Sequence, residues 1–171
     1  DDLFHSSTNE NRAIVVIAIF LALFAVLLWL ADRAGKKNRL LTAIRIPDAL
    51  TIGIAQALAL MPGVSRSGIT LPAGLFRDFK RSDAARFSFL LGIPLISVAG
   101  LKGLSDLIQS DPSGAEITRI VAGMTASAIT GFAAIRFLLR YLQHSSTTVF
   151  VVYRLLASAV LIGLVLSGFR S

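Results

Sequence analysis

The chain has no cysteine, few charged residues, and very little glutamate or histidine. Of its 171 residues 16% are charged, two are histidines, and glutamate occurs only as Glu10 and Glu116. The absence of cysteine excludes a disulfide framework, a thiolate metal site and a cysteine nucleophile. The two histidines, His5 and His144, are best read as surface residues, so a serine–histidine–carboxylate triad and a metal-binding box are both poorly supported. No G-x-x-x-x-G-K-[ST] segment occurs, which excludes a Walker-type nucleotide site.

Apolar residues dominate what remains. They make up 54% of the chain, and the mean hydropathy is +0.73, well above that of a typical soluble domain. The formal net charge is +7, with the basic residues in short clusters between apolar runs. This pattern suits anionic lipid head groups and membrane orientation better than nucleic acid, so we expect an integral membrane protein that does not bind nucleic acid.

The apolar runs predict four membrane-spanning helices. Residues 13–31 carry no charge, and at about 1.5 Å per residue they cover about 28 Å, close to the hydrocarbon thickness of a bilayer. Three further segments of suitable length are residues 84–105, 117–138 and 149–169. Arg154 lies deeper in its span than the other basic residues. It either snorkels to the interface beside Tyr153 or faces a polar cavity, and the sequence leaves both readings open.

The charges between these spans predict their orientation. Residues 32–47 and 77–86 are rich in lysine and arginine, whereas residues 106–116 hold three acids and no base. Both basic loops are therefore expected in the cytoplasm, and both ends of the chain outside it. In the third span Gly123, Ser127 and Gly131 recur every four residues, a pattern typical of close helix packing.

Residues 49–76 must then leave the cytoplasmic side and return to it, which predicts a re-entrant helical hairpin. Its first arm of 12 residues would reach about 18 Å, roughly halfway across the bilayer. We expect Asp48 to cap the incoming helix and "MPG" at 61–63 to end it. Thr70 is expected to cap the outgoing helix, with Pro72 in its first turn.

The tip of this hairpin reads "GVSRSGIT" at residues 63–70 and places an arginine near the bilayer middle. Such a charge costs several kcal/mol unless it meets an anion or water, so Arg66 is a candidate functional residue. Hydroxyl groups, flexible glycines and the positive end of a helix surround it, and together they suit phosphate oxygens. The candidate phosphate-binding residues are Ser65, Arg66, Ser67, Thr70, Gly63 and Gly68. A polar turn whose arginine pairs with a carboxylate elsewhere remains the alternative.

Three segments of the chain resemble the undecaprenyl-pyrophosphate phosphatase family, also called the bacitracin-resistance protein family. They are "GIAQALALMPGVSRSGITLPAGL" at 53–75, "AARFSFLLGIPLI" at 84–96 and "VVYRLLASAV" at 151–160. The motif PGxSRSGxT is matched at 62–70 in every fixed position, and the similarity runs from about residue 13 to the end.

The resemblance implies a multi-pass enzyme of the bacterial inner (plasma) membrane. It would dephosphorylate undecaprenyl pyrophosphate to undecaprenyl phosphate, which recycles the lipid carrier for peptidoglycan synthesis and gives bacitracin resistance. It also implies an all-α fold of two inverted repeats, each with a re-entrant helix pair. By the motif match Arg66 would bind the diphosphate, with Ser65, Ser67 and Thr70 around the phosphates and Gln56 facing the pocket from the incoming arm.

One feature of the family is missing. Its other half carries a glutamate-rich motif with serines and a histidine, held to supply acid–base chemistry and the site for a divalent cation (Mg or Ca). Because neither glutamate here lies in such a motif, we expect the carboxyl-terminal portion of the enzyme, inactive alone, with the missing amino-terminal half as its partner and a homodimer left open. The rival interpretations are a polyprenyl-phosphate or anion transporter (flippase) that uses the same re-entrant site, and a purely structural membrane subunit.

Overall fold

The computed structural model describes residues 2–59, 64–110 and 113–167, with side chains from residue 12 onward. Every named element in this part is helical: α1 (Asp2–Ala34), the 3₁₀ turn η1 (Leu41–Ala43), α2 (Ile46–Leu58), α3 (Arg66–Phe76), α4 (Arg81–Gln109), α5 (Gly114–His144) and α6 (Thr148–Leu166). Four segments are long and apolar enough to cross a membrane: Arg12–Ala34, α4, α5 and α6. The predicted all-α membrane fold with four spans is therefore confirmed.

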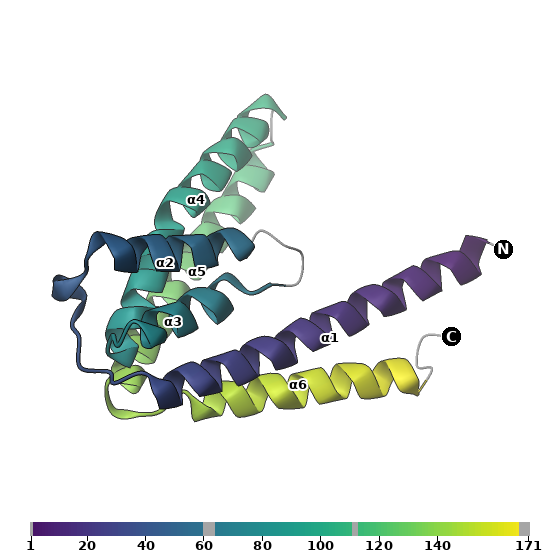
Figure 1. Cartoon of the computed structure of the whole chain (residues 1–171). Coiled ribbons are helices and arrows are strands. Elements are labelled where there is room, and N and C mark those ends of the chain that lie inside the picture. Colours follow the sequence, from purple (N-terminus) through teal and green to yellow (C-terminus); the bar gives the residue numbers. More distant parts are fainter. Residues whose placement is uncertain (1, 60–63, 111–112, 168–171) are drawn as a thin grey trace.

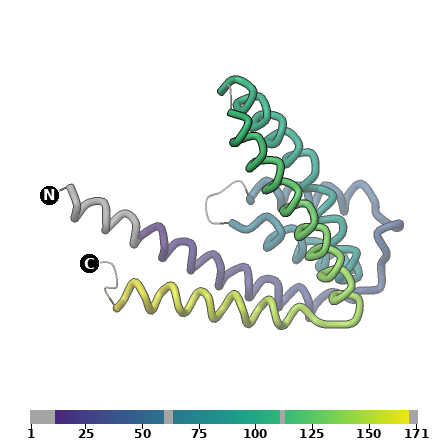
Figure 2. Tube along the Cα trace, turned by 180° about the vertical axis from the view of Figure 1, so that it is seen from behind, coloured from purple at the N-terminus to yellow at the C-terminus, as the bar shows by residue number. Residues whose placement is uncertain are grey.

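The long helices form two arms that diverge from a common end (Figures 1 and 2). In one arm α1 and α6 lie side by side, and in the other α4 lies beside α5. The short helices α2 and α3 lie between the arms, next to each other, and α3 packs on both α1 and α4. The hairpin formed by α2 and α3 thus occupies the angle between the arms, with the start of α3 pointing away from the end where the arms meet.

An ion pair ties three helices together where the arms meet. Arg81, at the start of α4, donates to Asp32 at the end of α1, with nitrogen–oxygen distances of 2.6 and 3.1 Å. The backbone N–H of Thr147, just before α6, lies 3.4 Å from the same carboxylate. The loops before α2 and α4 are rich in basic residues, namely Lys36, Lys37, Arg39, Arg45, Arg77 and Lys80, so we call this the basic end. That the basic loops share one end agrees with the orientation predicted from loop charge.

A second carboxylate fixes the hairpin to the same end. Asp48 is fully buried and accepts from Arg39 at 2.6 Å, from Arg77 at 2.7 Å and from the backbone N–H of Arg45 at 3.0 Å. The Arg39 guanidinium, and after it Arg77, holds the pKa of this carboxyl well below its usual range despite burial. Asp48 therefore joins the start of α2, the end of α3 and the loop after α1.

Two helix starts differ from those predicted. Arg45, not Asp48, is the N-cap of α2, and Asp48 occupies the third helical position, where its carboxylate reaches back to the N–H of Arg45. Ser65, not Thr70, caps α3, so Pro72 lies inside that helix instead of in its first turn. The N-cap of α2 lies three residues before Asp48 because that carboxylate accepts from the N–H of Arg45, and the N-cap of α3 lies five residues before Thr70 because the Ser65 hydroxyl accepts from the N–H of Gly68.

The buried core also lies near the basic end. It joins Leu28 of α1, Ile52 of α2, Leu75 of α3 and Phe79, each no more than 1% exposed, and burial of such side chains is worth about 1.5–3 kcal/mol apiece. Beyond Gly92 the remainder of α4 is largely exposed, as is most of α5. These apolar faces are available to lipid or to other parts of a longer protein.

Candidate functional site

The first turn of α3 forms the centre of the candidate site. Ser65 caps the helix by accepting from the N–H of Gly68 at 3.3 Å, and its hydroxyl lies 3.4 Å from that of Ser67. The N–H groups at the start of a helix have no partner within it and carry the positive end of the helix dipole. Four of the predicted residues, Ser65 to Gly68, thus lie together in one helix N-terminal turn, whose unpaired N–H groups are of the kind that suit an anion.

Arg66 extends from this turn onto α4. Its guanidinium lies against Gly92, with Nη1 3.4 Å from the Gly92 carbonyl oxygen. A Cβ added to Gly92 would be 2.8 Å from Cζ and Nη1 and 3.0 Å from Nη2 of Arg66, closer than real side chains approach. Only glycine at position 92 leaves room for the guanidinium in this position.

Gln56 reaches the same part of α4 from α2. Its Nε2 donates to the carbonyl oxygen of Leu91 at 3.3 Å, one residue from the carbonyl that Arg66 approaches. Its Oε1 is buried and has no hydrogen-bond partner among the described residues. An unpaired buried acceptor is costly, so this side chain is ready to accept from a ligand or from a group not described here.

Thr70 lies one turn into α3 and is fully buried. Its hydroxyl donates to the carbonyl oxygen of Arg66 at 2.9 Å and lies 2.5 Å from the hydroxyl of Ser88 on α4. Because the single hydroxyl proton of Thr70 is donated to the carbonyl oxygen of Arg66, the Ser88 hydroxyl must be the donor in its bond with Thr70. In this arrangement Thr70 and Ser88 fix the backbone that carries Arg66 and do not extend to the tip.

Arg154 of α6 reaches the other side of the same turn. Its Nη1 would be 3.1 Å from a Cβ placed on Gly68, and this nitrogen is buried with no hydrogen-bond partner in the described part of the chain. The side chain lines a cavity of about 190 Å³ together with Ser67, Ser88 and apolar residues of α1, α4 and α5. Of the two readings left open by the sequence, snorkelling does not fit the buried Nη1, but the cavity that Arg154 lines is mainly apolar and not the polar one expected.

The structure therefore groups most of the predicted site residues around the start of α3. Ser65, Arg66, Ser67 and Gly68 form the turn, Gln56 flanks it, and Thr70 lies beneath it. Gly63 and the "MPG" turn lie outside the described residues. Sequence reasoning assigned no role to Gly92 or Ser88, although both lie within a segment that carries the family resemblance. For Arg154 the sequence did give an indication, because an arginine deep in an apolar span is unusual.

The electrostatics of this turn are one-sided. In the part of the chain that the structure describes, Arg66 and Arg154 form no salt bridge, and the well-buried acids Asp32 and Asp48 are occupied at the basic end. The alternative in which Arg66 pairs with a carboxylate therefore has no support among these residues. The described residues also contain no cluster of three histidine, aspartate or glutamate side chains suited to a metal ion. The positive charge around this turn therefore favours an anionic ligand.

Comparisons with known proteins show the family of this chain. The family model "Bacitracin resistance protein BacA" matches residues 3–160. A protein of Thermomicrobium roseum named undecaprenyl-diphosphatase is 47% identical over 162 residues, 95% of this chain and 58% of that protein. One of the same name from Gloeobacter violaceus is 50% identical over 157 residues, 92% of this chain and 54% of that protein. The chain thus spans about half the length of the curated relatives it matches, and over that span it belongs to the bacitracin resistance protein BacA family.

Proposed function

We propose that this chain is the carboxyl-terminal portion of an undecaprenyl-diphosphatase, and that it holds the phosphate-binding half of the active site. Two relatives that share about half of its residues carry that name. The whole enzyme would convert undecaprenyl pyrophosphate to undecaprenyl phosphate in the bacterial plasma membrane. Recycling of this carrier would support peptidoglycan synthesis and bacitracin resistance.

The observation that carries the proposal is the buried Nη1 of Arg154 beside the first turn of α3, which has no hydrogen-bond partner among the residues that the structure describes. A buried cation without a partner is expensive, and an anion would relieve that cost. Arg66, on the α4 side of the turn, presents a second guanidinium, and Ser65 and Ser67 add hydroxyl groups. Two guanidinium groups and a helix N-terminus suit a diphosphate better than a singly charged ligand.

The residues of this chain would act mainly by binding and by charge stabilisation. Attack by an oxygen nucleophile on the terminal phosphorus forms one P–O bond and breaks the bond to the bridging oxygen, leaving the lipid monophosphate as product. Negative charge spreads over the phosphoryl oxygens during this step, and fixed positive groups stabilise it. Arg66 and Arg154 supply those groups, while Thr70 and Ser88 keep Arg66 in position.

Acid–base groups and a divalent cation would come from the missing amino-terminal half. A Mg or Ca ion would add positive charge at the phosphates, but the residues described here do not form a site for it. We therefore assign no step to the cation. A homodimer is a further possibility, because Gly123 and Gly131 on α5 have open space around them.

The proposal is tested by phosphate release from a C15 or C55 polyprenyl diphosphate, measured with magnesium and with a chelator. The protein is the chain extended upstream to the full length of its relatives, with the chain alone for comparison. We expect release only by the extended protein, with loss of release in Arg66→Ala. Arg119→Gln, on the exposed surface of α5, is the matched control and should leave release unchanged.

Release by Arg66→Ala at the parent rate would overturn the assignment of the phosphate site. If the extended protein binds the polyprenyl diphosphate tightly but releases no phosphate under any condition, the chemistry is wrong and a transporter that uses the same turn becomes the better account.

A further inference from the structure

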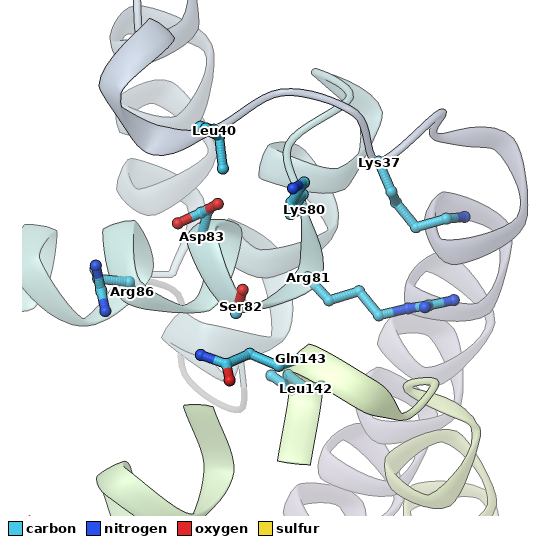
Figure 3. A pocket seen from close by; sticks show the side chains of 9 residues that line it. All are labelled: Lys37, Leu40, Lys80, Arg81, Ser82, Asp83, Arg86, Leu142 and Gln143. Carbon is cyan, nitrogen blue, oxygen red and sulfur yellow. The ribbon is translucent and has the colours of Figure 1, made fainter. Parts of the chain in front are cut away.

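A second concave surface lies at the basic end, away from the turn that carries Arg66. It consists of two adjoining cavities of about 560 and 470 Å³ between α4 and α5, and both are lined by Arg86 and Gln143. Figure 3 shows the first cavity, with Leu142 and Gln143 of α5 facing the first turn of α4 and Arg86 further along that helix. We call the two cavities together the α4–α5 groove.

The charge lining this groove is strongly positive. Five cations line it, namely Lys37, Lys80, Arg86, Arg136 and Arg140, and none of them forms a salt bridge within the described residues. Arg81 also lines it but is paired with Asp32. The sole acid among the lining residues is Asp83. The excess of positive charge on this surface favours an anionic ligand.

The groove combines apolar and basic side chains along α5. Phe132, Ile135 and Leu139 line its α5 side, spaced three and four residues apart so that they share a helix face. The first two are 68% and 41% exposed. Along the chain, Arg136 lies between Ile135 and Leu139, and Arg140 and Gln143 follow Leu139 towards the basic end. An apolar strip flanked by basic side chains, on a helix long and apolar enough to span a membrane, matches a lipid with a charged head and an apolar chain.

We propose that the α4–α5 groove binds an anionic diacyl phospholipid. Its phosphate lies among Arg86, Arg136 and Arg140, and an acyl chain lies along Phe132, Ile135 and Leu139. A free phosphate ion would leave the apolar strip uncovered. The positive-inside rule places this end in the cytoplasmic leaflet, where basic pockets between spanning helices bind anionic head groups.

This groove is distinct from the cavity at Arg154. That cavity is lined by other faces of the same two helices, including Ala85, Ser88 and Leu138, and the two sets share only Leu142. Lipid in the groove would therefore contact neither Arg66 nor Arg154. The inference goes beyond the proposed phosphatase activity and does not depend on it.

The test uses the protein extended to full length and purified in detergent. Native mass spectrometry counts bound phosphatidylglycerol over a concentration series, with zwitterionic phosphatidylcholine, which has no net charge, as the comparison. We expect the parent to retain phosphatidylglycerol and not phosphatidylcholine. In Arg136→Gln/Arg140→Gln the apparent dissociation constant should rise roughly thirtyfold, because each basic residue near the head group contributes about a factor of five.

The control for position is Arg119→Gln, which removes one positive charge at the opposite end of α5, as Arg140→Gln does in the groove, and should bind like the parent. Arg136→Lys/Arg140→Lys keeps the charge and should lose less than threefold. Equal binding of phosphatidylglycerol by the double glutamine variant and the parent would overturn the proposal, as would equal retention of phosphatidylcholine. If the double variant does not fold, Arg140→Gln alone is measured, and a change below twofold counts against the groove.

Discussion

Gly92→Ala should disable the proposed enzyme while leaving its fold intact. The added Cβ would lie 2.8 Å from Cζ and Nη1 of Arg66, whereas ordinary contacts between such atoms are about 3.4–4 Å. The guanidinium must therefore retreat by roughly 0.6–1.2 Å. It can do so, because it is the far end of a flexible side chain, and the backbone around it need not move.

The effect on activity is expected to be large. A misplacement of about 1 Å in a group that positions substrate costs on the order of a hundredfold in rate, or about 2.7 kcal/mol in transition-state stabilisation. The effect on stability should be small or opposite in sign, since alanine favours a helix interior over glycine by about 1 kcal/mol. Phosphate release by the full-length protein and its thermal midpoint together separate the two effects.

Gly100→Ala provides the control on the same helix. A Cβ at Gly100 meets nothing within 4 Å, so this variant should gain helix propensity without loss of activity. If Gly92→Ala releases phosphate within threefold of the parent, the position of Arg66 in the structure is not the one that matters for catalysis. If both variants lose activity equally, the close approach at Gly92 is not the cause.

Three further predictions concern the charged residues. Arg66→Lys should recover little of the activity lost in Arg66→Ala, because an ammonium group lacks the two-pronged geometry of guanidinium; phosphate release measures this. Arg154→Gln should weaken substrate binding at least tenfold, seen as a rise in KM, whereas a parent-like KM would remove Arg154 from the site. Asp48→Asn should lower the free energy of unfolding by about 2 kcal/mol, since Arg39 and Arg77 both donate to this buried carboxylate. Because the pKa of Asp48 is lower in the folded than in the unfolded protein, its contribution is complete above about pH 5 and is lost as the pH falls below about 4. Thermal midpoints of the parent should therefore drop on acidification more than those of Asp48→Asn, and parallel curves would refute the assignment.

The sequence predicted the membrane architecture because that architecture follows from composition and length. An uncharged run such as residues 13–31 has few alternatives to a spanning helix. The short helices of the hairpin were harder, because several polar residues competed as caps. Asp48 and Thr70 were plausible caps by residue type, yet Arg45 and Ser65 precede the helices in the structure. Cap choice depends on which backbone N–H groups remain unpaired, and tertiary contacts decide that.

The sequence predicted only the part of the candidate site that lies within one contiguous motif. Ser65 to Gly68 are contiguous, so their juxtaposition follows from a single helix turn. Gly92 and Ser88 meet that turn only because α4 packs against α3, and no local pattern marks such contacts. Arg154 comes from α6, 88 positions after Arg66, and its sequence context fitted snorkelling as well as a cavity.

The buried Nη1 of Arg154, which has no partner among the described residues, also affects how product would be released from the site. A buried positive charge makes affinity depend steeply on the charge of the ligand, so a diphosphate should bind more tightly than a monophosphate, and a neutral prenyl alcohol hardly at all. The proposed hydrolysis would remove part of the charge that holds the lipid. The reaction would then lower the affinity of the site for its own lipid product. Diphosphate substrate would displace the monophosphate product even when both are present in the same membrane.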